Sequence, residues 1–148
     1  MSFQLDSRLQ NDTFLIGEGE GEGCQLLLMN DKRYPWFILV PTVANVSEWF
    51  ELPDADQSRL HLASVKLGHC IRDAFDCEKI NIGALGNIVR QMHIHVVGRF
   101  VTDPAWPGPV WGHSAAVHYT EDERRMRCQR LFEQQNLPFK PLDGVLRP

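Results

Sequence analysis

Residues 91–100 have the sequence "QMHIHVVGRF", in which two histidines occupy alternate positions of an otherwise apolar run. Successive side chains of a β-strand point to opposite faces of a sheet. We therefore predict a strand over residues 88–97 that carries Gln91, His93 and His95 on one face. The apolar residues between them would pack into a hydrophobic core, so the chain would place a row of polar side chains opposite that core.

The composition is that of a folded protein without a strongly charged surface. The chain has 148 residues, of which 43% are hydrophobic and 23% charged, and its formal net charge is −4. This length suits one domain, and we expect a single domain over residues 1–148 whose tail, from about residue 101, forms an ordered loop and a helix. The net negative charge argues against general nucleic-acid binding.

Two features of the sequence bear on where the protein works. No apolar stretch reaches the roughly 20 residues that span a bilayer. The segment "MSFQLDSRLQ" (1–10) lacks the basic and apolar regions of a signal peptide. We therefore expect a cytoplasmic protein that does not bind membranes.

The four cysteines, at positions 24, 70, 77 and 128, include no C-x-x-C pair. That spacing is typical of structural zinc sites and of thioredoxin-like redox motifs. Cys70 and Cys77 would lie two turns apart on one helix, at a separation of about 10 Å, which is too long for a disulfide. We expect reduced thiols that pack as small hydrophobic side chains.

The N-terminal part of the chain predicts antiparallel strands. A short amphipathic turn leads into a hairpin of strands 13–16 and 24–30, and its connection "GEGEGEG" (17–23) is too polar to be buried. A third strand follows at residues 36–41, and its continuous apolar run indicates burial on both faces.

Two helices are predicted further along. Residues 54–79 have apolar side chains at helical spacing, and Asp54 or Asp56 can cap the start of this helix. A two-strand region follows and ends in the histidine strand. Thr120 and Glu123 have the spacing of a capping box, so a second helix begins there. The predicted fold is α+β with an antiparallel sheet.

Three interpretations of His93 and His95 are open. They can be ordinary residues of a half-buried strand. They can bind zinc or copper, although a metal site needs further ligands, and His113 and His118 lie too far along the chain to be assigned. They can also act on phosphorus, with one neutral imidazole as the nucleophile and the other neutralising phosphate oxygens.

The stretch "NIGALGNIVRQMHIHVV" (81–97) resembles the signature of the histidine triad (HIT) superfamily, in which three histidines alternate with apolar residues behind a glycine-bearing turn. The segment "LLLMNDKRYPWFILVP" (26–41), followed by a long helix and the histidine strand, matches the order of elements in the family. The later segment "RFVTDPAWPGPVWG" (99–112) resembles the tail of a bacterial branch of it. The resemblance implies a two-layer fold with about five antiparallel strands, one long helix and a C-terminal helix. One position differs, because Gln91 stands where the first triad histidine is expected.

The resemblance also implies a chemistry. HIT proteins bind a nucleotide with its α-phosphate against the histidines, and hydrolysis or nucleotidyl transfer proceeds through a histidine–nucleotidyl intermediate. His93 would be the nucleophile, with its other ring nitrogen held by an acceptor such as a backbone carbonyl. His95 would hydrogen-bond the phosphoryl oxygens, and Gln91 would complete the catalytic set without a charge. The substrate would be a dinucleoside polyphosphate or a nucleoside phosphoramidate, and no cofactor is expected.

Three asparagines match nucleotide-binding positions of the family. Asn30 would contact the ribose, and Asn81 and Asn87 would contact phosphate; ordinary turn chemistry is the alternative for each. Arg99 would either reach the phosphate tail or lie exposed after the strand.

The resemblance further implies a homodimer formed through sheet and helix. The two tryptophans of residues 101–112 lie among prolines and glycines and would offer aromatic surface to such an interface. Two other functions remain open. One is a nucleotide-binding module with weak or lost catalysis, and the other is a metal-binding protein.

Overall fold

A six-stranded antiparallel sheet forms the centre of the protein in this computed structural model, which describes residues 2–19 and 23–147. The spatial order is β4-β5-β3-β2-β1-β6. The strands are β1 (Thr13–Gly19), β2 (Cys24–Met29), β3 (Trp36–Pro41), β4 (Lys79–Gly83), β5 (Ile94–Arg99) and β6 (Phe139–Pro141). The predicted α+β class is confirmed, and the expected count of about five strands is close to the six observed.

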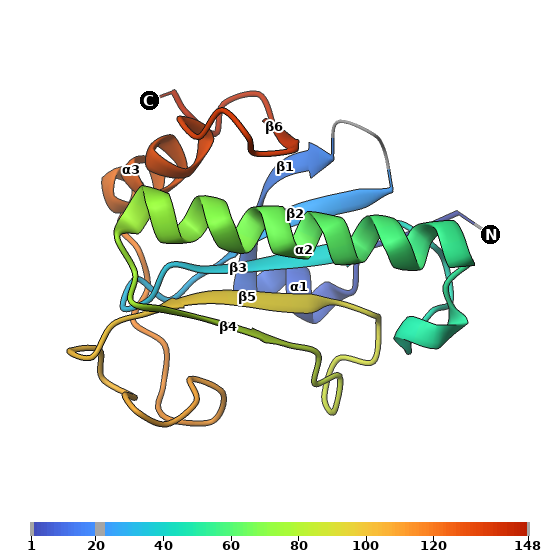
Figure 1. The fold of residues 1–148 in the computed structure, drawn as a ribbon, viewed down its shortest axis with the longest axis horizontal. Helices are drawn as coiled ribbons and strands as arrows, with labels where there is room; N and C mark the ends of the chain where they lie inside the picture. The colour runs from blue at the N-terminus through green and yellow to red at the C-terminus, as the bar shows by residue number, and fades with distance from the viewer. Residues whose placement is uncertain (1, 20–22, 148) are drawn as a thin grey trace.

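Helices lie on both faces of this sheet. The long helix α2 (Asp54–Phe75) crosses one face, and the short helix α1 (Ser7–Asp12) lies on the other (Figure 1). The C-terminal helix α3 (Glu121–Phe132) lies beside the C-terminal end of α2, and a short 3-10 helix, η1 (Trp49–Glu51), precedes α2. None of these helices is long and apolar enough to cross a membrane.

Alternation along the strands produces two hydrophobic cores. Ile94 and Val96 of β5 belong to the core beneath α2, whereas Val97 belongs to the core on the opposite face. The β3 residue Ile38, which pairs with His95, also belongs to the opposite core. His95 therefore points away from α2, as its place in the alternation requires.

The predicted strand 88–97 is wrong in its first half, because β5 begins only at Ile94. The β3 ladder with β5 ends at the pair Leu39–Ile94. The Met92 N–H donates instead to the carbonyl of Val46, at 2.9 Å. The Met92 N–H is therefore satisfied outside the sheet, and Gln91 and His93 lie on the segment that leads into the strand.

Helix α2 is shorter than the predicted range 54–79. Asp76 adopts a left-handed conformation with φ 56° and ends the helix, which lets the chain turn into β4. Pro53 occupies the N-cap position, so the prediction of Asp54 or Asp56 as the cap is also wrong. Both carboxylates lie in the first helical turn, where the positive end of the helix dipole favours them.

The other ends of the chain match the predictions more closely. The capping box of α3 is confirmed, since Thr120 and Glu123 each accept a hydrogen bond from the other's backbone N–H. β1 extends to Gly19, beyond the predicted end at residue 16, and part of the predicted turn (20–22) lies outside the described residues. The sequence did not predict β6, which pairs with β1.

All four cysteines are free thiols, as expected. Burial raises the pKa of Cys24 to about 12 and that of Cys77 to about 11. A thiol reacts as its thiolate, so these two side chains serve packing rather than chemistry.

Candidate active site

His93 is held by the backbone immediately before it. Its Nδ1 lies 2.7 Å from the carbonyl oxygen of Gln91, and the side chain is only 6% exposed. A carbonyl only accepts hydrogen bonds, so Nδ1 carries the ring proton and Nε2 keeps its lone pair. This is the backbone-carbonyl acceptor that the family resemblance implies for His93.

His95 has the opposite arrangement. The Trp36 indole Nε1–H donates to Nδ1 of His95 at 2.9 Å, so the proton of the neutral ring sits on Nε2. Burial, and secondarily the neighbouring His93, lowers the pKa of His95 to about 3. The second imidazole is therefore an uncharged N–H donor near neutral pH. In this form it carries no positive charge with which to neutralise phosphate oxygens, and its role toward them stays a prediction.

The two imidazole rings lie close together beside two indoles. The centroids of His93 and His95 are 4.9 Å apart, with the planes inclined at 64°. The ring of Trp111 lies 5.5 Å from His95 and 6.4 Å from Trp36. The histidine pair thus combines one lone pair and one N–H donor in a site with an aromatic wall.

The side chain of Gln91 is directed to the N-terminal segment. Its Oε1 accepts from the Asp6 N–H at 2.9 Å, and its Nε2 donates to the Gln4 carbonyl at 2.8 Å. Both ends of the amide are therefore engaged by the chain itself. Gln91 contacts the ring of His93 through its main-chain oxygen.

Arg99 is buried, with 1% exposure, so the second of its two predicted alternatives, an exposed side chain after the strand, is wrong. It forms two hydrogen bonds to Asp103, of 2.8 and 2.9 Å, and a third to Oδ1 of Asn81 at 2.8 Å. Although burial opposes ionisation, these bonds hold the pKa of Asp103 below its ordinary value. Asn81 is thus bound to Arg99 within the sheet, and Asn87 lies exposed on the loop after β4.

Asn30 lies at the end of β2, where it lines a pocket of about 330 Å³. Its Oδ1 accepts from the Tyr119 N–H at 2.9 Å. The pocket lies between the end of α1, the end of β2 and the loop 110–118, and Trp36 is part of its lining. Neither His93 nor His95 lines this pocket, which we call the Trp36 pocket, and Trp36, which bonds His95, connects it to the histidine pair.

The loop over the Trp36 pocket is fixed to the turn between β2 and β3. Arg33 donates to Ser114 Oγ at 2.6 Å, and the Lys32 N–H donates to the Val117 carbonyl at 2.8 Å. Arg33 is itself oriented by Asp31, with hydrogen bonds of 2.8 and 2.9 Å. At its other end the loop is anchored by the Arg99–Asp103 pair, so Trp111 is carried by a segment held on both sides.

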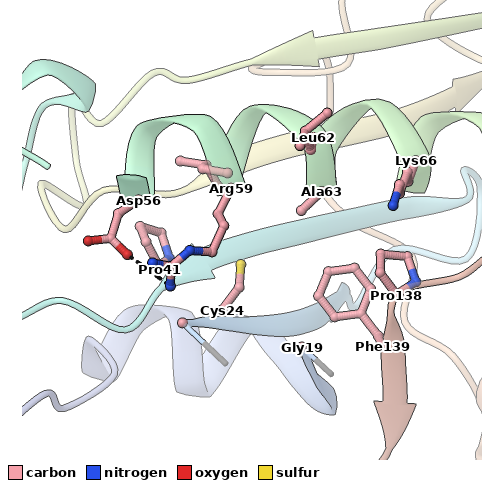
Figure 2. Close-up of a pocket in the computed structure, with 12 residues that line it drawn as sticks. Gly19, Cys24, Pro41, Asp56, Arg59, Leu62, Ala63, Lys66, Pro138 and Phe139 are labelled. Carbon is pink, nitrogen blue, oxygen red and sulfur yellow. Dashed lines mark ion pairs between the residues drawn. The ribbon is translucent and has the colours of Figure 1, made fainter. Parts of the chain in front are cut away.

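A second pocket, of about 210 Å³, lies on the α2 side of the sheet. Figure 2 shows it between α2, the start of β2 and β6, with Asp56 and Arg59 joined as an ion pair at its rim. Its lining includes neither His93 nor His95. Among residues 2–19 and 23–147, no group of three or more His, Cys, Asp or Glu side chains is placed to hold a metal ion.

Trp36 and Trp111 are two residues of the site that the sequence does not predict. Trp36 starts a strand predicted to be buried, which gave it an ordinary packing role. Its contact with His95 depends on the pairing of β3 with β5, in which Trp36 lies opposite Val97. The tryptophans of residues 101–112 are predicted to offer surface to a dimer interface, whereas Trp111 contacts His95 of its own chain.

An open antiparallel sheet with one long helix across a face and a histidine pair at the start of a central strand is the architecture of the histidine triad proteins. A model of the HIT domain matches residues 8–102, and the chain belongs to this family. HIT-domain proteins are in general nucleotide-binding hydrolases or transferases. A search of curated proteins found no match.

Solved structures of histidine triad proteins are similar over nearly the whole chain. The protein from Sinorhizobium meliloti 1021 is 48% identical, with 88% of this chain and 96% of that chain covered and a TM-score of 0.85. The protein from Marinobacter aquaeolei VT8 is 43% identical, with coverages of 93% and 97% and a TM-score of 0.82. That from Bradyrhizobium japonicum is 32% identical, with coverages of 90% and 98% and a TM-score of 0.86.

Proposed function

We propose that this protein cleaves a nucleotide conjugate at its α-phosphate, as a hydrolase or a nucleotidyl transferase, with His93 as the nucleophile. The observation that carries the proposal is the 2.7 Å hydrogen bond from Nδ1 of His93 to the Gln91 carbonyl. It leaves Nε2 unprotonated, and an imidazole in this form attacks without first losing a proton. Family membership supports nucleotides as the substrate class.

The first step forms a bond between Nε2 of His93 and the α-phosphorus. The bond from phosphorus to the leaving group breaks, and the leaving group takes the electron pair. The ring of His93 becomes positively charged, and the Gln91 carbonyl stabilises this charge through the Nδ1–H. The Nε2–H of His95 donates to a phosphoryl oxygen on which negative charge accumulates.

The second step releases the nucleotide from His93. Water attacks phosphorus, the P–N bond breaks, and its electron pair returns to Nε2. The proton that water loses passes to the solvent. A hydroxyl or amine acceptor in place of water gives nucleotidyl transfer by the same sequence of bond changes.

The Trp36 pocket is the proposed site of the nucleoside. Its volume of about 330 Å³ falls in the range of small-molecule pockets. Met29, Val110 and Trp36 supply apolar surface, while Asn30 and His118 supply polar groups at its rim. A nucleoside there would present its 5′-phosphate toward the histidines, because Trp36 lies in the pocket and against His95.

A second candidate function is a nucleotide-binding module with weak or lost catalysis. One observation favours it. The Gln91 side chain bonds Asp6 and Gln4, so the site has two imidazoles, those of His93 and His95, in place of the three of a histidine triad. Binding would then persist without measurable turnover. Turnover assays with nucleotide conjugates separate the two functions.

The homodimer is proposed on the exposed edge of the sheet. β4 is an outermost strand, and Ile82 on it is 49% exposed. Ile88, on the loop that follows, is 75% exposed. An edge strand with apolar neighbours is a natural surface for pairing with a second copy.

The decisive experiment compares wild type with His93→Ala on nucleotide conjugates. Turnover by His93→Ala should fall to background, while nucleotide binding, measured by calorimetry, should stay within a few-fold. Rapid acid-free quenching of wild type with labelled nucleotide should trap a phosphoramidate adduct on His93. Arg59→Ala, in the pocket of Figure 2, is the matched control and should turn over like wild type. Near-normal turnover by His93→Ala would overturn the proposed function.

A further inference from the structure

We infer that a pocket beside the C-terminal helix binds a phosphate group, as inorganic phosphate or as a small phosphate monoester, at a site separate from the histidine pair. This pocket, which we call the α3 pocket, has a volume of about 270 Å³ and lies where α3 passes the C-terminal end of α2 (Figure 1). It shares no lining residue with the Trp36 pocket, and neither His93 nor His95 lines it. The site is therefore additional to the one proposed for the nucleotide.

The charge of the α3 pocket is the first support. Lys32, Arg127 and Arg130 contribute three positive charges, and Glu123 is the one carboxylate among the described residues that line the pocket. Three positive charges and one negative charge leave a formal excess of two positive charges. A phosphate monoester carries a charge of about −1.5 to −2 at pH 7 and would balance this excess. Because Glu123 pairs with Lys32 at 3.1 Å, the excess charge belongs to the two arginines.

The two arginines of the α3 pocket differ from those nearer the start of the same helix. Arg125 pairs with Asp122 at 2.9 Å. Within the part of the chain that the structure describes, no carboxylate oxygen lies within 4.0 Å of the guanidinium nitrogens of Arg127 or Arg130. An anion that enters the pocket would therefore not have to displace a carboxylate of the protein from either arginine.

Hydrogen bonds to oxygen atoms of the protein orient both guanidinium groups. Arg127 donates from Nε to the Tyr119 hydroxyl and from Nη2 to the Lys32 carbonyl, at 3.0 Å in each case. Arg130 donates from Nη2 to the Ala74 carbonyl at 2.6 Å. A guanidinium has five N–H donors, so both groups keep donors that can bond phosphate oxygens.

The aromatic ring of Phe75 supports the two guanidinium groups from one side. The guanidinium carbon of Arg127 lies 4.9 Å from the ring centroid, and that of Arg130 lies 5.2 Å from it. Stacking on an aromatic face and a planar set of donors are the properties that suit arginine to phosphate recognition. Because the groups are already oriented, less conformational entropy is lost when an anion binds.

The Tyr119 hydroxyl can supply an uncharged donor to the same ligand. It accepts the Nε–H of Arg127, and in no hydrogen bond of the described residues does it act as the donor. Burial raises the pKa of Tyr119 to about 12, although Arg127 opposes this effect, so the hydroxyl keeps its proton at neutral pH. A phosphate oxygen in the α3 pocket could therefore accept from a hydroxyl as well as from two guanidinium groups.

The test is a titration followed by proton–nitrogen-15 spectra, which resolve backbone amides and the Nε–H groups of arginine. Inorganic phosphate, added at constant ionic strength, should shift the Nε–H signals of Arg127 and Arg130, whereas chloride should not. Ribose 5-phosphate is the second arm. Tighter binding of the ester than of inorganic phosphate would identify a phosphate monoester as the ligand, and the reverse order would identify free phosphate.

Arg130→Gln should weaken phosphate binding, measured from the remaining shifts, by about tenfold or more, because it removes a charged hydrogen-bond donor. Arg125→Gln is the matched control, since it removes the same charge from the same helix at a residue that does not line the pocket. Its affinity for phosphate should stay within about twofold of wild type, because distant charges on a surface are screened.

Three results would overturn the inference. One is a wild-type response confined to residues around His93 and His95, which would decide the matter even if Arg130→Gln failed to fold. The second is an equal response to chloride and phosphate. The third is equal weakening by Arg125→Gln and Arg130→Gln, which would reveal general attraction to the charge of α3. None of these measurements uses turnover, so their outcome is independent of the proposed function.

Discussion

Nδ1 of the His93 ring lies 2.7 Å from the main-chain carbonyl oxygen of Gln91. Any residue at position 91 has this carbonyl, so the orientation of the His93 ring does not depend on the side chain there. The Gln91 amide instead fixes residues 4–6 to the edge of the site. Gln91 thus stabilises the N-terminal segment through its side chain and orients the His93 ring through its main chain.

Replacing Gln91 should therefore affect stability more than rate. Gln91→Ala removes two hydrogen bonds and should lower the free energy of unfolding by about 1–3 kcal/mol, while kcat stays within a few-fold of wild type. Urea unfolding and turnover assays measure the two effects. Gln10→Ala, which removes one exposed hydrogen bond to the Leu5 carbonyl, is the control and should cost less. A 100-fold loss of kcat at unchanged stability would mean that the Gln91 side chain takes part in catalysis.

Breaking the Arg99–Asp103 ion pair should cause a large loss in the free energy of unfolding. Both side chains are 2% exposed, so Asp103→Ala strands a buried guanidinium and should lower the free energy of unfolding by about 3–5 kcal/mol. Asp122→Ala breaks an ion pair whose carboxylate is 85% exposed and should change it by less than about 1 kcal/mol. Equal losses in the two variants would show that burial does not govern these pairs.

The free energy of unfolding should decrease as the pH is lowered, because of His95. An unfolded histidine titrates near 6.5, whereas the folded pKa of His95 is about 3. Between these values the unfolded chain binds a proton that the folded chain does not. The free energy of unfolding should therefore decrease as pH falls from about 6.5, by up to about 1.4 kcal/mol per pH unit from this group.

His95→Gln tests this dependence, because an amide oxygen keeps an acceptor for Trp36 but does not titrate. Urea midpoints from pH 7 to pH 4.5 should decline less steeply in this variant than in wild type. The exposed His61→Gln is the control for loss of a histidine as such. Identical slopes in wild type and His95→Gln would mean that His95 is already protonated in the folded protein.

The proposed dimer should depend on the β4 edge. Light scattering at tens of micromolar should give twice the chain mass, and Ile82→Lys should give the monomer. Met126→Lys on α3, at a residue that is also exposed, should remain dimeric. A monomeric wild type would rule out this assembly.

The sequence predicts most of the secondary structure because its periodic patterns are strong. The histidine strand shows the limit of such patterns. Alternation alone does not predict where a ladder of hydrogen bonds begins. Here the Met92 N–H bonds Val46 outside the sheet, and β5 begins only at Ile94, three residues after Gln91. Of the three residues predicted to share one strand face, His95 lies on the strand, while the Gln91 side chain bonds residues 4 and 6.

Within the site, contacts between residues close in sequence are easier to predict than contacts between residues far apart in sequence. A carbonyl acceptor for His93 follows from family resemblance and lies two residues away. The bond from Trp36 to His95 joins residues 59 positions apart, and Arg99 finds Asn81 across an antiparallel pair. Such contacts depend on strand register, which a single sequence does not reveal.

The anchored loop, which carries Trp111, extends this site beyond the part of the chain that matches the HIT domain. The HIT match stops at residue 102, yet Trp111 and the residues that fix its loop to the β2–β3 turn lie beyond it. A chain cut after residue 102 would keep both histidines but would expose the face of His95 to solvent. Proteins of this family can therefore differ in the hydration of the histidine pair through a segment that the HIT-domain match does not include.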